Sequence, residues 1–493
     1  MTLNRKEKSI AEAVAMYAKE QPNKLCLGDG KRELSYEAYW RSITGYAKRL
    51  KELGVGHGDC VVVRNSQNME FVTVGLAIQL LGGIFVPVEK NIANNRIMEI
   101  YNMVQAKGYI ANKAEEVPGF YESMKQVFDY QDEAMDVDTF AFPQWEDTAE
   151  ILFTTGTTGV SKGIELTHKN VVSVAENVIG GVEMKKDNVE LIPVPLSHSH
   201  GLRRYYSNML NGSAVILMDG VVFTAKVFTN MEKYGVTSMD LVPAALATIF
   251  QLSGEKIGDY SEQMDYIQLG SAPIPEKDKD TLRKLFPNTR LYNFYGTTES
   301  GCSSILDFNK VRDDKNCIGR PTCHAKFAFV DNDGNHIEAT KENPGLLACS
   351  GDMNMKGYYK SEKLNAETIK DGYIVTQDLS YMDENGMIYL LGRQGDVISS
   401  GGNKIAPSEI EDVTLEISGV LECACVPVSH PILGQEPKLF VVMEKDVSYD
   451  EEKVHQHLKD RLENYKVPKL IVELDKLPRT YNGKIQRNVL MEM

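Results

Sequence analysis

The sequence predicts an α/β protein with a large N-terminal domain of mixed sheets and helices and a small, mobile α+β C-terminal domain. Three observations predict this fold class. The 493 residues exceed what one hydrophobic core usually organises. Apolar strand-like runs alternate with helix-like stretches, which is typical of parallel βαβ units. A glycine-containing segment, residues 392–396, precedes a compact final stretch. We therefore place the domains at residues 1–392 and 393–493.

Composition narrows the classes of function. Lys and Arg number 54 against 69 Asp and Glu, a formal net charge of −15. Such acidity argues against nucleic acid or an anionic membrane as the main partner. No apolar run approaches the length of a membrane span, and the N-terminus carries no evident signal peptide. The eight cysteines lack paired metal spacing, so we expect free thiols, notably Cys423 and Cys425, in a reduced, cytoplasmic protein.

The first 150 residues contain a clear βαβ pattern. Residues 9–20 and 35–53 have the spacing of amphipathic helices, with Ser35 as N-cap and Gly54 as the stop of the second. Residues 60–63 and 84–88 are buried-type strands around a helix that ends near residue 81, which predicts a right-handed parallel unit. Residues 111–148 are acidic and weakly patterned, so we expect a variable connection there.

The segment FTTGTTGVSKG, residues 153–163, is the most informative stretch of the chain. It follows an apolar strand-like run and combines hydroxyls, glycines and a lysine. Glycines let the backbone approach a ligand, and hydroxyl and N–H groups can converge on an anion. The spacing differs from the P-loop of NTPases. A mobile polar surface turn is the alternative. The predicted polyphosphate-binding residues are Thr154, Thr155, Gly156, Thr157, Thr158, Gly159 and Lys162.

Two later segments add candidate nucleotide contacts. Residues 270–273 form a turn of small residues that can approach a flat ring closely. In RLYNFYGTTESG, Tyr295 offers a face to a purine, Thr298 a hydroxyl to a phosphate and Glu299 a hard oxygen to Mg²⁺. A plain β-turn is the alternative for this second segment. The nucleotide candidates from both segments are Gly270, Ser271, Ala272, Pro273, Asn293, Tyr295, Gly296 and Thr297, and Glu299 is the metal candidate.

Histidine and arginine residues follow a strand-like run in IPVPLSHSHGLRR. His198 is a candidate to line a ligand pocket, with a structural role as the alternative. Arg203 and Arg204 either begin a helix as solvated residues or give that pocket a polar wall. A polar wall favours a modest-sized or polar-substituted ligand, because an unpaired buried charge is costly.

The last third of the chain predicts a hairpin, a linker and a small domain. Residues 372–396 have the pattern of paired strands with a turn at residues 384–386, and Asp378 ends a strand-like run. Arg393 begins the candidate linker. Helices are expected from residue 407 and at residues 449–464. Lys484 lies beside Asn482 and Gly483, a tight-turn pair near the C-terminus.

Three segments follow one another along the chain: TTGTTGVSKG, YGTTE and PRTYNGK. The adenylate-forming superfamily carries its signatures in the same order, and almost the whole chain resembles that superfamily. Its members include acyl- and aryl-CoA synthetases, luciferases and the adenylation domains of peptide synthetases. The resemblance implies that Lys484 enters the active site, that His198 gates the carboxylate site and that Asp378 accepts the ribose hydroxyls. It also implies rotation of the small domain about Gly395, where relatives commonly carry Asp or Lys.

The resemblance implies an AMP-forming carboxylate–CoA ligase. Such an enzyme uses ATP and Mg²⁺ to convert a small carboxylic acid to an acyl-adenylate, releases pyrophosphate, and transfers the acyl group to CoA. The catalytic candidates are Thr298, Glu299, His198 and Lys484, and Arg393 joins the nucleotide candidates. A stand-alone adenylation enzyme that loads a carrier-protein pantetheine thiol is one alternative. A nucleotide-binding regulatory protein without catalysis is another. The sequence leaves the acid and the oligomeric state open.

Overall fold

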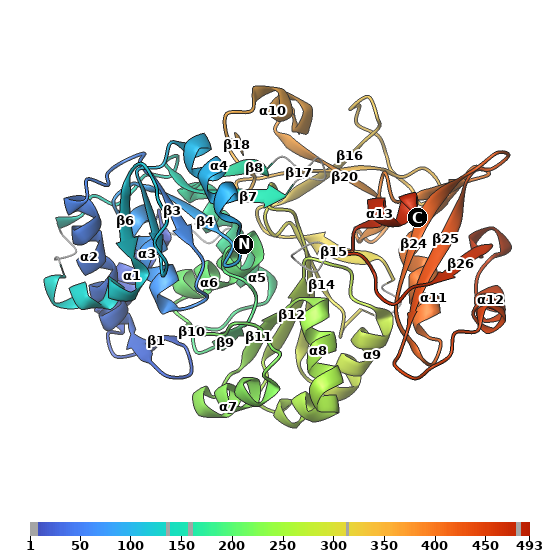
Figure 1. The fold of residues 1–493 in the computed structure, drawn as a ribbon, viewed down its shortest axis with the longest axis horizontal. Coiled ribbons are helices and arrows are strands. Elements are labelled where there is room, and N and C mark those ends of the chain that lie inside the picture. The colour runs from blue at the N-terminus through green and yellow to red at the C-terminus, as the bar shows by residue number, and fades with distance from the viewer. Residues whose placement is uncertain (1–7, 135–138, 156–160, 312–314, 480–484) are drawn as a thin grey trace.

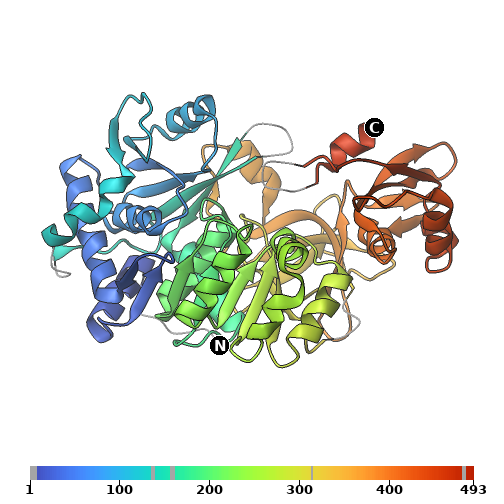
Figure 2. The same cartoon turned by 60° about the horizontal axis from the view of Figure 1, so that its bottom comes forward.

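The computed structural model describes residues 8–134, 139–155, 161–311, 315–479 and 485–493. Within these residues the chain forms sheets of seven, fourteen and five strands. The two larger sheets contain every strand up to Arg393, and the five-stranded sheet begins at Ile398. Figures 1 and 2 both place the C-terminal part, coloured orange to red, at one end of an elongated molecule. The predicted mixed α/β architecture, with a large N-terminal and a smaller C-terminal part, is confirmed.

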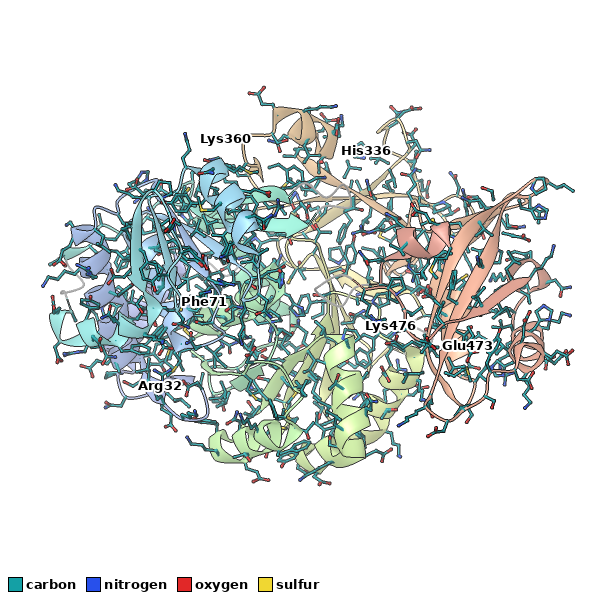
Figure 3. All side chains as sticks on the ribbon, viewed as in Figure 1. Arg32, Phe71, His336, Lys360, Glu473 and Lys476 are labelled. Atoms are coloured by element: carbon teal, nitrogen blue, oxygen red, sulfur yellow. The ribbon has the colours of Figure 1, made fainter. Side chains whose placement is uncertain are left out.

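The seven-stranded sheet contains the predicted βαβ unit. Its strands, in spatial order, are β18 (Gly357–Tyr358), β8 (Ser161–Thr167), β7 (Thr148–Thr155), β4 (Ile84–Val88), β3 (Cys60–Arg64), β5 (Gly108–Ala111) and β6 (Phe120–Ser123). Strands β3 and β4 are parallel, and the helix between them, α3 (Met69–Leu80), is buried along its whole length. Phe71 of α3 lies among the packed side chains of this part (Figure 3). The predicted parallel pairing over residues 60–88, with a helix between the strands, is therefore confirmed.

The two predicted N-terminal helices are also present, as α1 (Ile10–Glu20) and α2 (Tyr36–Glu52). The Ser35 side chain accepts a hydrogen bond from the Ala38 N–H, which makes Ser35 the predicted N-cap. Gly54 has a φ of +84°, as expected of a residue that stops a helix.

The described part of residues 111–148, where the sequence predicts a variable connection, contains regular structure. Residues 120–123 form β6, which pairs with β5, and a 3₁₀ helix, η1 (Met124–Glu133), packs on α2. At Gly45 of α2, a Cβ atom would lie 2.1 Å from the Tyr130 carbonyl oxygen. Contacts with α2 and β5 hold residues 120–133 in place. A segment held by such distant contacts can form without a strong periodic pattern of apolar residues in its own sequence.

The fourteen-stranded sheet runs through the middle of the molecule. In spatial order it contains β16 (Lys326–Val330), β17 (Gly345–Ser350), β20 (Tyr373–Met382), β21 (Ile388–Arg393), β15 (Cys317–Pro321), β14 (Ser304–Asp307), β13 (Arg290–Tyr295), β12 (Tyr266–Gly270), β11 (Ser238–Leu241), β9 (Val189–Ile192), β10 (Ala214–Leu217), β1 (Leu25–Gly28) and β2 (Glu33–Ser35), with β19 (Ile369–Lys370) paired to β20. From β1 to β13 neighbouring strands are parallel. Their carboxyl ends therefore share one edge, the usual location of a ligand site in such sheets.

Helices connect the strands of both larger sheets. They are α4 (Asn94–Val104), α5 (His168–Gly181), α6 (Ser199–Asn211), α7 (Thr224–Tyr234), α8 (Pro243–Ser253), the 3₁₀ helix η3 (Gly254–Tyr260), α9 (Glu276–Leu285) and α10 (Glu362–Thr368). The largest hydrophobic core joins α1, α2, α3, α5 and α6 to both sheets. In the described part of the chain, no helix is long and apolar enough to cross a membrane.

The five-stranded sheet and its helices form the C-terminal part. The elements are β22 (Ile398–Ser400), β23 (Asn403–Ile405), α11 (Pro407–Leu415), β24 (Val420–His430), β25 (Gly434–Met443), α12 (Glu451–Lys459), the 3₁₀ helix η4 (Asn464–Lys466), β26 (Leu470–Glu473) and α13 (Arg487–Glu492). The expected helix over residues 449–464 is thus shorter. Cys423 and Cys425 are buried free thiols in β24, as predicted.

Candidate active site

The predicted phosphate-binding segment is the hairpin of β7 and β8. The strands are antiparallel, and Thr154 is paired with Lys162. The turn between them, which contains Gly156, Thr157, Thr158 and Gly159, lies outside the described residues, and the Thr155 side chain is likewise not described. Thr154 and Lys162 are partly exposed at the tip of the hairpin. Thr154 and Lys162 therefore place a hydroxyl and an ammonium group beside the turn that is expected to bind phosphates.

A two-residue strand brings this hairpin to the candidate metal ligand. Strand β18 pairs with β8, and the Tyr358 hydroxyl donates a hydrogen bond of 2.8 Å to Glu299 Oε1. Lys162 Nζ lies 5.8 Å from the centre of the Tyr358 ring. Burial and the Glu299 carboxylate raise the pKa of the Tyr358 phenol, so the hydroxyl remains a donor. Tyr358 therefore lies between Lys162 and Glu299, and sequence reasoning missed it.

Three predicted nucleotide residues also lie together in the fourteen-stranded sheet, where β13 and β21 end beside the middle of β20. The Tyr295 hydroxyl donates a hydrogen bond of 2.5 Å to Asp378 Oδ2. Arg393 is paired with Asp378 across β20 and β21, and its Nε lies 3.8 Å from Asp378 Oδ1. Burial, and then Asp378, raise the pKa of Tyr295. The contact of Asp378 with ribose stays a prediction, as does that of Tyr295 with the purine.

The turn after Tyr295 is held by local hydrogen bonds and by a close backbone approach. The Thr297 and Ser300 side chains each accept from the other's backbone N–H, at 3.1 Å and 3.3 Å respectively. A Cβ at Gly296 would lie 1.7 Å from the Gly301 carbonyl oxygen, so only glycine fits there. Thr298 and Glu299 are partly exposed on this turn. Asn293 lies two residues before Tyr295 on β13.

The predicted small-residue turn follows β12. Gly270 ends the strand, Ser271 has a φ of +69°, and residues 271–273 are exposed. Ser271 Oγ lies 2.7 Å from His200 Nδ1, while His200 Nε2 lies 2.9 Å from Asp240 Oδ1. Sequence reasoning did not assign a role to His200 or Asp240. The signal available was the pair of histidines in SHSHG, of which only the first was chosen.

His198 is the N-cap residue of α6, and its Nε2 lies 3.6 Å from Glu89 Oε1 at the end of β4. Burial raises the pKa of Glu89. The expectation that Arg203 and Arg204 are solvated or line a polar wall was wrong. Their side chains are buried and paired with Glu150 and Glu190. The carboxylates that hold them lie on β7 and β9, outside the helix that carries the arginines.

Lys484 lies outside the described residues, but the chain on both sides of residues 480–484 is described. Arg479 and Ile485 form an isolated β-bridge, and the Gln486 N–H donates to the Pro478 carbonyl at 2.8 Å. Arg487 donates to both oxygens of Glu411 in α11. These contacts fix the chain on either side of the predicted catalytic lysine.

The donor set suits Mg²⁺ as bound with a nucleotide. The described residues contain no cluster of three or more His, Cys, Asp and Glu side chains able to hold a metal by themselves. Mg²⁺ commonly takes one or two protein carboxylates together with phosphate oxygens and waters. Glu299, with Thr298 beside it and Lys162 across Tyr358, meets that requirement.

Comparison with known proteins agrees with this geometry. The model of the AMP-binding enzyme family matches residues 14–359, and that of the AMP-binding enzyme C-terminal domain matches residues 409–484. The chain is 27% identical over 485 residues to a 2-succinylbenzoate–CoA ligase of Bacillus mycoides (strain KBAB4), covering 96% of each chain.

Solved structures share the fold. ATP-bound MatB from Rhodopseudomonas palustris has a TM-score of 0.87 at 24% identity, over 98% of each chain. The o-succinylbenzoate CoA synthetase MenE from Bacillus subtilis, in complex with the acyl-adenylate intermediate OSB-AMP, has a TM-score of 0.84 at 24% identity, over 97% of each chain. The predictions of an adenylate-forming enzyme and of an acid–thiol ligase are confirmed. The chain belongs to the AMP-binding enzyme family.

Proposed function

We propose that this protein joins a small carboxylic acid to CoA in two steps, through an acyl-adenylate made from ATP. The observation that carries the proposal is the contact between the phosphate-loop hairpin and the YGTTE turn. Tyr358 contacts both Lys162 and Glu299, so a cationic group and a candidate metal-binding carboxylate lie near the same side chain. An ATP polyphosphate with its bound Mg²⁺ needs both of these groups.

In the first step, a carboxylate oxygen of the acid attacks the α-phosphorus of ATP and pyrophosphate leaves. Negative charge develops on phosphate oxygens, so positioning and positive charge carry the catalysis. Residues 154–162 hold the departing phosphates, and Lys484 contacts the α-phosphate and the carboxylate. Glu299 would hold Mg²⁺, which would supply further neutralising charge. Asp378 accepts the ribose hydroxyls, Tyr295 and residues 270–273 enclose the adenine, and His198 borders the acid.

In the second step, the CoA thiol attacks the acyl carbonyl and AMP leaves. The small domain, proposed as residues 393–493, rotates between the two steps about Gly395. The change from β21, which ends at Arg393, to β22, which begins at Ile398, supports a linker at this place. The second candidate acceptor is a carrier-protein pantetheine thiol, which presents the same chemical group. We also propose a cytoplasmic location, because all eight cysteines are free thiols.

A pyrophosphate-release screen tests this function. Short, medium, long-chain and aromatic acids are each supplied with ATP and Mg²⁺, with and without CoA, and the products are identified by mass spectrometry. We expect AMP, pyrophosphate and an acyl-CoA from at least one acid. Release of orthophosphate instead of pyrophosphate, or nucleotide binding without turnover on any acid, would contradict the proposal. Adenylate formation with transfer only to a carrier protein would favour the second acceptor.

A further inference from the structure

Gln67 lies in the turn between β3 and α3 and is buried, with 6% of its surface exposed. Its φ of +51° lies in the left-handed region, which residues other than glycine adopt rarely and mostly where their surroundings require it. The Asn65 side chain supports this turn, since its Oδ1 accepts a hydrogen bond of 2.7 Å from the Gln67 N–H. The fold thus holds Gln67 in an unusual backbone conformation, and the contacts of its side chain show what this conformation achieves.

The Gln67 carboxamide bonds to the main chain of two segments that follow strands of the fourteen-stranded sheet. Its Nε2 donates to the Val194 carbonyl, after β9, at 2.7 Å and to the Met218 carbonyl, after β10, at 3.1 Å. Its Oε1 accepts from the Leu196 N–H at 2.9 Å and from Asn65 Nδ2 at 3.2 Å. Two donated and two accepted bonds are the full capacity of a carboxamide. Gln67 therefore joins the end of β3 in one sheet to the ends of β9 and β10 in the other.

Residues 194–197 lie between β9 and α6 and belong to no helix or strand. Their backbone groups depend on partners from elsewhere, and Gln67 bonds to one carbonyl and one N–H of this loop. A Cβ at Gly201, in the first turn of α6, would lie 2.4 Å from the Pro195 carbonyl oxygen, so the loop also packs tightly against the helix. The loop leads directly into His198, the N-cap residue of α6. A shift of the loop would therefore move His198.

We propose that Gln67 is a positioning residue of the acid site, which fixes residues 194–197 and thereby the His198 imidazole beside the carboxylic acid. This inference rests on the proposed ligase function, in which His198 borders the acid. In this role Gln67 does not contact the substrate. Without its carboxamide, the backbone groups that it binds would lose their partner, and the loop would move to regain hydrogen bonds. A displacement of about 1 Å in a residue of the site can cost on the order of 100-fold in rate.

The test uses Gln67→Met, which keeps a side chain of similar length and removes the hydrogen bonds of the carboxamide. With the acid that gives the highest kcat/KM in the pyrophosphate-release screen, kcat/KM for that acid is measured at saturating ATP. The Kd and stoichiometry of ATP binding are measured without acid by calorimetry. Gln263→Met is the matched control, because Gln263 Nε2 also donates to two backbone carbonyls, those of Met231 and Val236, near the amino end of β11.

We expect Gln67→Met to lower kcat/KM for the acid by about 10- to 100-fold while the Kd for ATP changes less than about twofold. Gln263→Met should change neither quantity. A general loss of folded protein would lower the stoichiometry of ATP binding to the same extent, so the two readouts separate a local effect from a global one. In a His198→Ala background, Gln67→Met should cost less than about twofold, because Gln67 acts through His198.

An unchanged kcat/KM in Gln67→Met would overturn the proposal, as would equal losses with and without the His198 side chain. Should Gln67→Met fail to fold, Gly201→Ala displaces the same loop from the side of α6, because its Cβ meets the Pro195 carbonyl. It should also lower kcat/KM for the acid and leave the Kd for ATP unchanged, and normal use of the acid would again overturn the proposal. A wild type that binds ATP but releases pyrophosphate with no acid would refute the ligase function itself, which is a different result from an active wild type with unaffected variants.

Discussion

Replacing Arg204 by leucine should destabilise the N-terminal part of the protein strongly. The guanidinium is fully buried and contacts Glu190 through Nε and Nη2 at 2.7 Å and 2.6 Å. It also donates to the Tyr266 hydroxyl at 2.9 Å and to Gln268. Leucine leaves the Glu190 carboxylate without its counter-charge. Breaking a buried ion pair in this way costs about 3–5 kcal/mol, roughly a hundred- to several-thousandfold in the unfolding equilibrium.

The loss should also depend on pH. In the wild type, burial raises the pKa of Glu190 above its usual 4.5, while Arg204 opposes that rise. Removing Arg204 therefore raises this pKa further. A carboxyl group with a higher pKa in the folded chain adds stability below its unfolded pKa, and this stability is lost as the pH rises through its folded pKa. The variant should consequently lose more stability at about pH 8 than at about pH 5, where Glu190 more readily takes up a proton.

Urea unfolding followed by tryptophan fluorescence measures this effect. The two tryptophans, Trp40 and Trp145, both lie in the N-terminal part, so the signal reports on the region that contains α6. Arg41→Leu is the control, because its pair with Asp132 is exposed and contributes about 1 kcal/mol at most.

The double variant with Glu190→Leu should recover much of the stability, since the Glu190 charge is removed together with its partner. The reasoning would be refuted if Arg204→Leu lost no more unfolding free energy than Arg41→Leu. It would also be refuted if the loss in Arg204→Leu were equal at both pH values.

Three further predictions concern the reaction, each checked by assaying adenylate formation and thioester formation separately. Lys484→Ala should slow adenylate formation about 100-fold or more, while thioester formation from a pre-made acyl-adenylate largely survives; equal losses would exclude the assigned role. Glu299→Gln should raise the Mg²⁺ concentration needed for turnover while nucleotide binding persists, and an unchanged Mg²⁺ titration would remove Glu299 from the metal site. Gly395→Pro should block one half-reaction and spare the other, although a Cβ there meets no atom within 4 Å. Wild-type rates in both would place the hinge elsewhere.

Local chemistry explains how much of this protein the sequence could predict. The strands at residues 60–63 and 84–88 and the helix caps at Ser35 and Gly54 depend on neighbouring residues, so their patterns are visible in one dimension. The same holds for the ordered signatures, because each is a short run whose residue types are set by the group it binds. These runs were sufficient to predict the family and its reaction class.

Only the tertiary structure shows which distant residues contact these sequence segments. Tyr358 reaches Glu299 because a two-residue strand pairs with β8, a contact across 59 residues that no local pattern signals. In the sequence, Arg203 and Arg204 are two adjacent basic residues of the kind that is usually exposed to solvent. The fold buries them because β7 and β9 place Glu150 and Glu190 against α6. Burial of a charge depends on the position of its counter-charge in space, and chain order alone does not give that position.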